Sequence, residues 1–136
     1  MKNSKSEILN SKQILNSKLE TGNARQYDLE DRTLKFAARV RDFVKKLPRS
    51  MTNIEIGSQL FRSAGSVGAN YIEANESLSK RDFVMRAKIS RKEAKESRYW
   101  LELSEPSAAE GDEKARLIQE ATELMKIFGA ILEKCL

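Results

Sequence analysis

The stretch Gln59–Glu76, with the sequence QLFRSAGSVGANYIEANE, decides the fold of this chain of 136 residues. At helical spacing its apolar side chains fall on one side of the segment, which is the pattern of an amphipathic helix. This apolar side consists of Leu60, Ala64, Val67, Tyr71 and Ala74. We therefore predict a helix that packs one face against a core.

The opposite side of this helix carries short polar groups with one Arg and one Glu, whereas an exposed helix surface normally carries many Lys and Glu side chains. The helix also tolerates Gly57, Gly65 and Gly68, each of which costs about 1 kcal/mol relative to Ala in a helix interior. Close approach of a neighbouring helix or subunit would compensate for that cost. We predict that a partner subunit covers the polar row, which consists of Arg62, Ser66, Asn70 and Glu73.

The length of the chain allows one domain, and its composition is typical of a soluble helical bundle. Apolar residues make up 40% and charged residues 33% of the chain, and it holds only two prolines. No apolar run approaches the roughly 18 residues of a membrane span, so we expect no membrane partner. Lys2 and Lys5 are not followed by the apolar segment of a secretory signal. The sequence thus predicts a cytoplasmic protein.

The chain has no histidine, which removes the usual general base, the common nucleophile pairs and the commonest zinc ligand. It also lacks a Gly-rich phosphate-binding loop. An enzyme would need Glu73 or Glu93 as an acid or base, and we interpret both as partners of Arg62 or of other basic groups across helices or subunits, because an unpaired buried carboxylate is costly. The lone Cys135 is interpreted as a small buried hydrophobe. We predict a non-catalytic protein with no metal and no cofactor.

Start and stop signals divide the rest of the chain into helices. Thr52 and Glu55 form a capping box that would start the helix already described, and Ser79 would cap the next. Short connections make consecutive helices antiparallel neighbours. We predict an all-α four-helix bundle at residues 27–136, with the other three helices at residues 28–47, 80–103 and 112–134.

Residues 1–26 repeat Asn-Ser-Lys with apolar pairs between the repeats. This low-complexity segment predicts a flexible tail, with a frayed amphipathic helix as the alternative. Its basic charge makes it a weak candidate for a nucleic-acid arm.

Core positions of the first and last predicted helices follow the helical repeat. The first helix would bury Leu29, Thr33, Phe36, Val40, Phe43, Val44 and Leu47. The last would bury Ala115, Ile118, Ala121, Met125, Phe128, Leu132 and Cys135, flanked by Leu117, Leu124 and Ile131.

The helix predicted at residues 80–103 has three sectors. Its core sector is dominated by small residues, which predicts close packing against the Gly- and Ala-rich helix before it; its members are Phe83, Ala87, Ser90, Ala94, Ser97 and Leu101. A second apolar sector lies away from the core and predicts self-association, with scattered exposure as the alternative. This second sector consists of Met85, Ile89, Trp100 and Leu103, with Glu93 and Glu96 among them.

The third sector of that helix is basic and comprises Lys88, Arg91, Lys95 and Arg98. The first predicted helix carries a second basic stripe at Arg32, Lys35 and Arg39. Such stripes bind phosphates by counterion release without reading sequence, so they predict contact with RNA or DNA. A solvated helix surface is the alternative for both.

Two separated motifs carry a resemblance to a known family: QLFRSAGSVGANYIEA at residues 59–74, and KISRKEAKESRYWLEL at residues 88–103. They resemble the four-helix bundle proteins encoded in intervening sequences of bacterial 23S rRNA genes. That family is in turn similar to the accessory protein of diversity-generating retroelements, a basic bundle that works with a reverse transcriptase. The resemblance begins near Tyr27 and extends to the end of the chain.

This resemblance implies an up-down-up-down left-handed bundle that assembles into a ring-shaped homopentamer. It also implies two family signatures, one formed by Arg62, Ser63, Ser66, Asn70 and Glu73, and the other by Glu93, Glu96, Trp100 and Leu101. The chain departs from the family pattern where Ile-Ala-Glu-Gly is replaced by Tyr71–Ala74, and again in its repetitive tail. Two functions remain open: an oligomer that binds RNA or DNA, and a scaffold that docks a protein partner.

Overall fold

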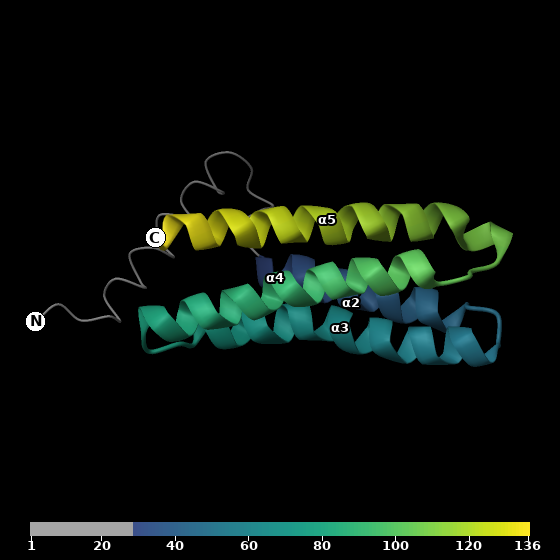
Figure 1. The fold of residues 1–136 in the computed structure, drawn as a ribbon, viewed down its shortest axis with the longest axis horizontal. Coiled ribbons are helices and arrows are strands. Elements are labelled where there is room, and N and C mark those ends of the chain that lie inside the picture. Colours follow the sequence, from purple (N-terminus) through teal and green to yellow (C-terminus); the bar gives the residue numbers. More distant parts are fainter. Residues whose placement is uncertain (1–28) are drawn as a thin grey trace, which may run out of the picture.

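The computed structural model describes residues 29–136, which form four long α-helices lying side by side (Figure 1). These helices are α2 (Leu29–Lys45), α3 (Met51–Asn75), α4 (Lys80–Leu103) and α5 (Gly111–Lys134), and a short 3₁₀ helix, η2 (Ala108–Glu110), precedes α5. The predicted all-α four-helix bundle is confirmed. The predicted tail at residues 1–26 lies outside the described residues.

Helix boundaries differ from the predictions at α2 and α3. The first helix ends at Lys45 and not at Leu47, since the residue before Pro48 is disfavoured in a helical conformation. Ser50, and not Thr52, caps α3: the Ser50 side chain accepts a hydrogen bond of 3.1 Å from the Asn53 amide. The predicted Thr52 capping box is therefore wrong.

The cap of α4 is as predicted. The Ser79 side chain accepts a hydrogen bond of 3.1 Å from the amide of Asp82. The four-residue turn at residues 76–79 therefore reverses the chain and places α4 antiparallel to α3.

Asn53 ties together three segments at one end of the bundle. Its buried side-chain amide donates to the carbonyls of Pro48 and Glu105, both at 3.0 Å. Its side-chain oxygen accepts from the Glu105 amide at 3.1 Å. The turn between α2 and α3 is thereby fixed to the segment that follows α4.

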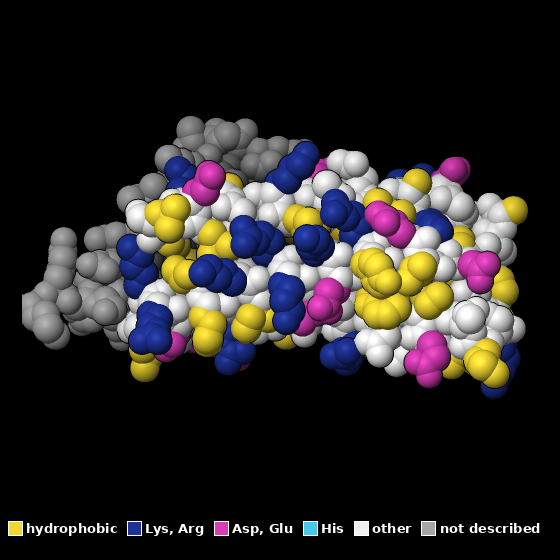
Figure 2. Space-filling view, viewed as in Figure 1, with side chains coloured by type: hydrophobic (Ala, Val, Ile, Leu, Met, Phe, Trp, Pro, Cys, Tyr) yellow, Lys and Arg dark blue, Asp and Glu magenta, His cyan; other side chains and the backbone are white. Residues whose placement is uncertain are grey.

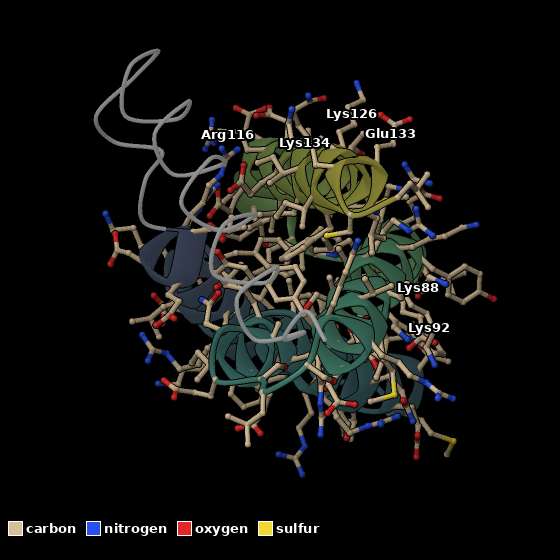
Figure 3. The ribbon with its side chains drawn as sticks, turned by 90° about the vertical axis from the view of Figure 1, so that its left-hand side faces the viewer. Lys88, Lys92, Arg116, Lys126, Glu133 and Lys134 are labelled. Atoms are coloured by element: carbon tan, nitrogen blue, oxygen red, sulfur yellow. The ribbon has the colours of Figure 1, made fainter. Side chains whose placement is uncertain are left out.

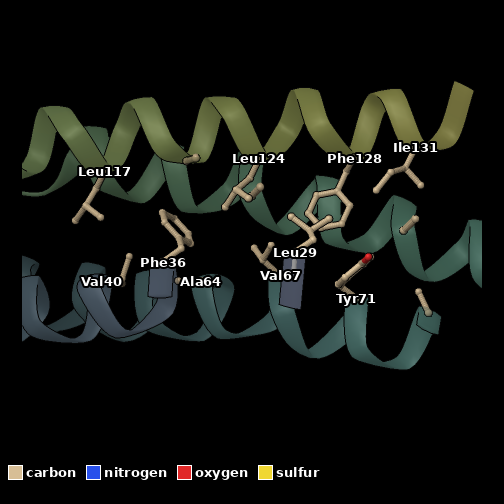
Figure 4. Close-up of a cluster of buried hydrophobic side chains, with 14 of the residues drawn as sticks. Leu29, Phe36, Val40, Ala64, Val67, Tyr71, Leu117, Leu124, Phe128 and Ile131 are labelled. Atoms are coloured by element: carbon tan, nitrogen blue, oxygen red, sulfur yellow. The ribbon is translucent and has the colours of Figure 1, made fainter. Parts of the chain in front are cut away.

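The core runs along the bundle axis between all four long helices (Figure 4). The rings of Tyr71 and Phe128 meet edge to face with their centroids 5.6 Å apart. In α5 the prediction is partly wrong, because Ala115 is exposed whereas Leu117 and Leu124 are fully buried. The larger side chains at seven-residue spacing fill the centre and set the rotation of α5.

Helices α3 and α4 form the most extensive helix interface, as their small residues predict. Ala64 and Ala87 are fully buried, and the hydroxyls of Ser63 and Ser97 are 2.9 Å apart. The Ser90 hydroxyl donates to the Val67 carbonyl at 2.9 Å. Short side chains that satisfy their own hydrogen bonds therefore let the two helices approach closely.

Two glycines of α3 differ in what surrounds them, and they give a matched pair of substitutions. A Cβ at Gly68 would lie 2.8 Å from Oγ1 of the buried Thr33, whereas one at Gly65 would meet nothing within 4 Å. We expect Gly68→Ala to lower the free energy of unfolding by about 1–2 kcal/mol through overpacking. Gly65→Ala should raise it by about 0.5–1 kcal/mol through helix propensity. Urea denaturation of both variants measures the difference, and a change of the same sign in both would contradict the packing described here.

Candidate functional site

The basic row of α4 lies on the outer surface of the bundle. Lys88, Arg91 and Lys95 are exposed, and the half-buried Arg98 donates to the hydroxyl of Thr122 on α5 at 3.3 Å. Figure 2 shows Lys and Arg side chains gathered over α4 and its border with α5. In Figure 3, Lys88 projects outward from α4, and Lys126 does so from α5.

Most of this row is electrostatically uncompensated. Within residues 29–136, neither Lys88, Arg91 nor Lys95 forms an ion pair with a carboxylate. Lys88 and Arg98, at the two ends of the row, are ten positions apart on α4, which corresponds to about 15 Å at 1.5 Å per residue. The structure thus brings all four predicted α4 residues onto one continuous surface.

The predicted stripe of α2 is engaged differently. The Arg32 guanidinium donates two hydrogen bonds of 2.8 Å to the Glu120 carboxylate and one of 2.9 Å to Glu123. Arg39 contacts the Glu113 carboxylate in the same way, at 3.1 and 3.2 Å. These ion pairs close the seam between α2 and α5, so the structure does not join Arg32 and Arg39 to the α4 row.

Lys35, the third residue of the α2 stripe, pairs with Asp31 at 2.8 Å one turn away on the same helix. A signal for the seam was present in the sequence. Arg32 and Arg39 are seven residues apart, and so are Glu113 and Glu120. Sequence reasoning treated the two helices separately and missed this match.

The charges of the seam perturb one another. Hydrogen bonding to Glu120 raises the pKa of Arg32 above its ordinary value. The hydrogen bonds from Arg39 lower the pKa of Glu113, and those from Gln119 and Arg32 lower the pKa of Glu123. The carboxylates of Glu113, Glu120 and Glu123 on α5 therefore neutralise Arg32 and Arg39 of α2. In the part of the chain that the structure describes, the α4 row has no such carboxylate partners and stays basic.

The seam predicts a pH-dependent loss of stability in Arg39→Met. Because the folded pKa of Glu113 lies below its ordinary value of 4.5, its ion pair stabilises the fold fully above that pH. The contribution is lost as the pH falls through the lower, folded pKa. Both partners are partly exposed, so we expect a cost of about 0.5–1 kcal/mol at pH 7 that vanishes in acid.

Chemical denaturation of wild type and Arg39→Met between pH 7 and pH 3 measures this prediction. Arg41→Met is the matched control, since among residues 29–136 Arg41 pairs only with its exposed neighbour Asp42. An Arg39→Met cost that persists unchanged at pH 3 would contradict the ion-pair interpretation.

The second apolar sector of α4, which is predicted to mediate self-association, is partly exposed to solvent. Met85 is 48% and Leu103 46% exposed, while Ile89 and Trp100 are half-buried. Tyr99 is 56% exposed and meets Trp100 edge to face at 5.1 Å. Sequence reasoning missed Tyr99, although helical spacing places it beside Leu103.

The two carboxylates of this sector lie close together. Burial raises the pKa of the half-buried Glu93, and the neighbouring carboxylate of Glu96 raises it further. Neither forms an ion pair with a basic side chain in the described part of the chain. The sector is therefore apolar with an acidic border.

The polar row of α3 lies beside α4. The exposed Arg62 donates to the Gln59 side chain at 2.7 Å and forms no ion pair with Glu73 or Glu93 within the described protomer, although its charge acts on Glu93. The predicted pairing across subunits stays a prediction. Asn70 donates to the Ser66 carbonyl at 2.9 Å and accepts from Arg86 of α4 at 3.0 Å. Arg86 is the bridging residue that sequence reasoning missed. Glu73 is exposed and Ser66 is half-buried.

A groove between α2 and α3 was not predicted. This corner groove has a volume of about 500 Å³, and its walls carry the exposed side chains of Ile54 and Phe61. It is lined by Val44, Lys45, Leu47, Pro48, Arg49, Asn53, Ile54, Gly57, Ser58 and Phe61. Ile54 and Phe61 are seven residues apart on the side of α3 that faces away from the core, which is the signal that was overlooked.

No helix in residues 29–136 is long and apolar enough to cross a membrane. The same part of the chain contains no cluster of three or more His, Cys, Asp or Glu side chains suited to hold a metal ion. Cys135 is buried, as predicted, and burial raises the pKa of its thiol.

Comparison with known proteins gives a family match and similar solved structures. The family described as 23S rRNA-intervening sequence protein matches residues 25–130. A solved structure, of a protein with unknown function from the S23 ribosomal protein family of Bacteroides thetaiotaomicron, is similar with a TM-score of 0.66 and 31% sequence identity. That match covers 76% of this chain and 96% of the other. No curated protein matches the sequence.

Proposed function

This chain belongs to the 23S rRNA-intervening sequence protein family, and we propose that it is a non-catalytic, homo-oligomeric bundle protein that binds RNA or DNA through the basic row of α4. One observation carries the proposal: within the described residues, Lys88, Arg91 and Lys95 have no carboxylate partner, whereas Arg32 and Arg39 are neutralised by α5. A row of free cations attracts phosphates and releases their counterions.

Self-association is supported by the exposed apolar sector of α4. Side chains as large as Met85, Tyr99 and Leu103 are about half exposed there and lie on one side of one helix. Burying such a sector against another subunit removes apolar surface from water. The family resemblance adds a ring of five subunits, in which five copies of a weak phosphate site would act together through avidity.

A binding titration tests this function. Fluorescently labelled RNA and DNA, single- and double-stranded, would be titrated with the protein at a series of NaCl concentrations. We expect similar affinities for different sequences and a steep linear fall of log affinity with log salt. Absence of binding at about 50 mM salt, or an affinity independent of salt, would overturn the proposal.

A second candidate function is a scaffold that docks a protein partner. It is favoured by Leu34 of α2 and Ile72 of α3, which are 66% and 46% exposed and lie outside both the basic row and the apolar sector of α4. Affinity purification after nuclease treatment distinguishes the two functions. One recurrent protein partner, with no retained nucleic acid, would favour the scaffold.

A further inference from the structure

Two surfaces of the bundle, one between α2 and α3 and the other on α4, have complementary character. The corner groove between α2 and α3 has apolar walls and carries Lys45 and Arg49 in its lining. The α4 patch, which we define as Tyr99, Trp100 and Leu103, is apolar and is bordered by Glu93 and Glu96. Figure 2 shows apolar side chains gathered over the half of α4 that ends at Leu103.

The charges that border these two surfaces form no ion pair within the described protomer. In residues 29–136, Lys45 and Arg49 form no ion pair, and neither do Glu93 and Glu96. A surface that is apolar with acidic side chains would therefore complement the groove. A surface that is apolar with basic side chains would complement the α4 patch. Each surface supplies what the other lacks, and every copy of the chain carries both.

Both surfaces lie at the same end of the bundle. The groove is formed at the turn between α2 and α3, and the patch lies in the last turn of α4 (Figure 1). The hydrogen bonds of Asn53 to Pro48 and Glu105 fix these two segments at one level. Two different surfaces at one level can repeat by rotation about an axis parallel to the helices, which closes a ring, whereas surfaces at different levels would build a filament.

We infer that the corner groove of one copy receives the α4 patch of the next copy, in a head-to-tail contact that repeats around a closed ring. The inference rests on the self-association in the proposed function and names the two surfaces that meet. Phe61 and Ile54 of the groove would pack against Leu103 and Tyr99. Lys45 and Arg49 would lie opposite Glu93 and Glu96.

Mixing two variants that each lose one surface tests the contact. The groove variant carries Ile54→Lys and Phe61→Lys, and the patch variant carries Tyr99→Lys and Leu103→Lys; all four side chains are about half exposed. We expect each variant alone to have the native mass of one protomer. Their mixture should give a one-to-one heterodimer, because only one intact groove and one intact patch remain. Leu34→Lys, on a side chain 66% exposed, is the matched control and should keep the wild-type mass.

Exchanging the charges of the two surfaces distinguishes loss of the contact from loss of the fold. Lys45→Glu with Arg49→Glu should dissociate the ring, and adding Glu93→Lys with Glu96→Lys to the same chain should restore it. A variant that fails to fold would not be rescued by two further surface substitutions. Circular dichroism would confirm that every variant keeps its helix content.

The outcomes separate the two proposals. A wild-type chain that is monomeric at tens of micromolar overturns the proposed self-association, whatever the variants do. An assembled wild type whose groove and patch variants stay assembled overturns this inference alone. A mixture that remains monomeric does the same, because head-to-tail pairing requires the heterodimer.

Discussion

A chain whose four basic α4 side chains are replaced by Gln should bind RNA or DNA about 10³-fold more weakly than wild type at ~0.1 M salt. The replaced residues are Lys88, Arg91, Lys95 and Arg98. Each phosphate contact contributes about 0.9 to the slope of log affinity against log salt, so four lost contacts lower that slope by about 3.6. The fold should remain, because the replaced side chains are exposed or, for Arg98, only half-buried.

Fluorescence anisotropy at several salt concentrations measures both the affinity and the slope. The control removes the same formal charge from other exposed positions on α2, α5 and the turn after α2, through Gln at Arg41, Lys46, Arg116 and Lys134. This control should change the affinity by less than about tenfold, since net charge acts over a distance and salt screens it. Equal losses in both variants would refute a localised site on α4.

Leu124→Ala should lower the free energy of unfolding by about 2.5–5 kcal/mol, the largest stability effect that we expect from one substitution. Leu124 is fully buried in the core between α5 and the facing helices. Truncation loses its transfer free energy and leaves a cavity that close-packed neighbours fill only in part. A single domain has about 5–15 kcal/mol in total, so this one substitution removes a large part of the stability.

The same substitution at Leu34 is the control, because Leu34 is 66% exposed on α2. Its expected change is within about 0.5 kcal/mol. Urea denaturation of both variants at equal protein concentration measures the difference. A Leu34→Ala cost as large as that of Leu124→Ala would mean that the α2 surface is covered.

The helices and most of the core followed from local patterns. Ser79 was recognisable as a cap, and α4 runs from Lys80 to Leu103 as predicted, because its cap and its repeat agree. The start of α3 was misplaced because Ser50 and Thr52 are both good caps, and the choice depends on the position of Asn53 in the folded chain. Rotation of α5 was misjudged for a similar reason: helical spacing allows several neighbouring stripes, and packing selects one.

The candidate site was only partly readable from the sequence. Lys88 and Lys95 share a face of one helix by spacing alone, and the structure keeps them together. Whether a basic side chain is free depends on which acidic helix faces it, and that is a property of the tertiary structure. Arg32 and Arg39 therefore looked equivalent to the α4 row until α5 was placed beside them. The corner groove also arises between two helices, so neither helix predicts it alone.

The seam between α2 and α5 sets the order in which the bundle should open. Its ion pairs join residues 74 to 91 positions apart, whereas the other seams join consecutive helices. Closing a long loop costs chain entropy that local pairing avoids, so this seam forms late in folding. Amide hydrogens of α2 should consequently exchange with solvent before those of α3 and α4, and added salt should hasten that exchange by screening the partly exposed arginines. Helix α2 would then separate from the bundle by local unfolding while α3, α4 and α5 stay packed together.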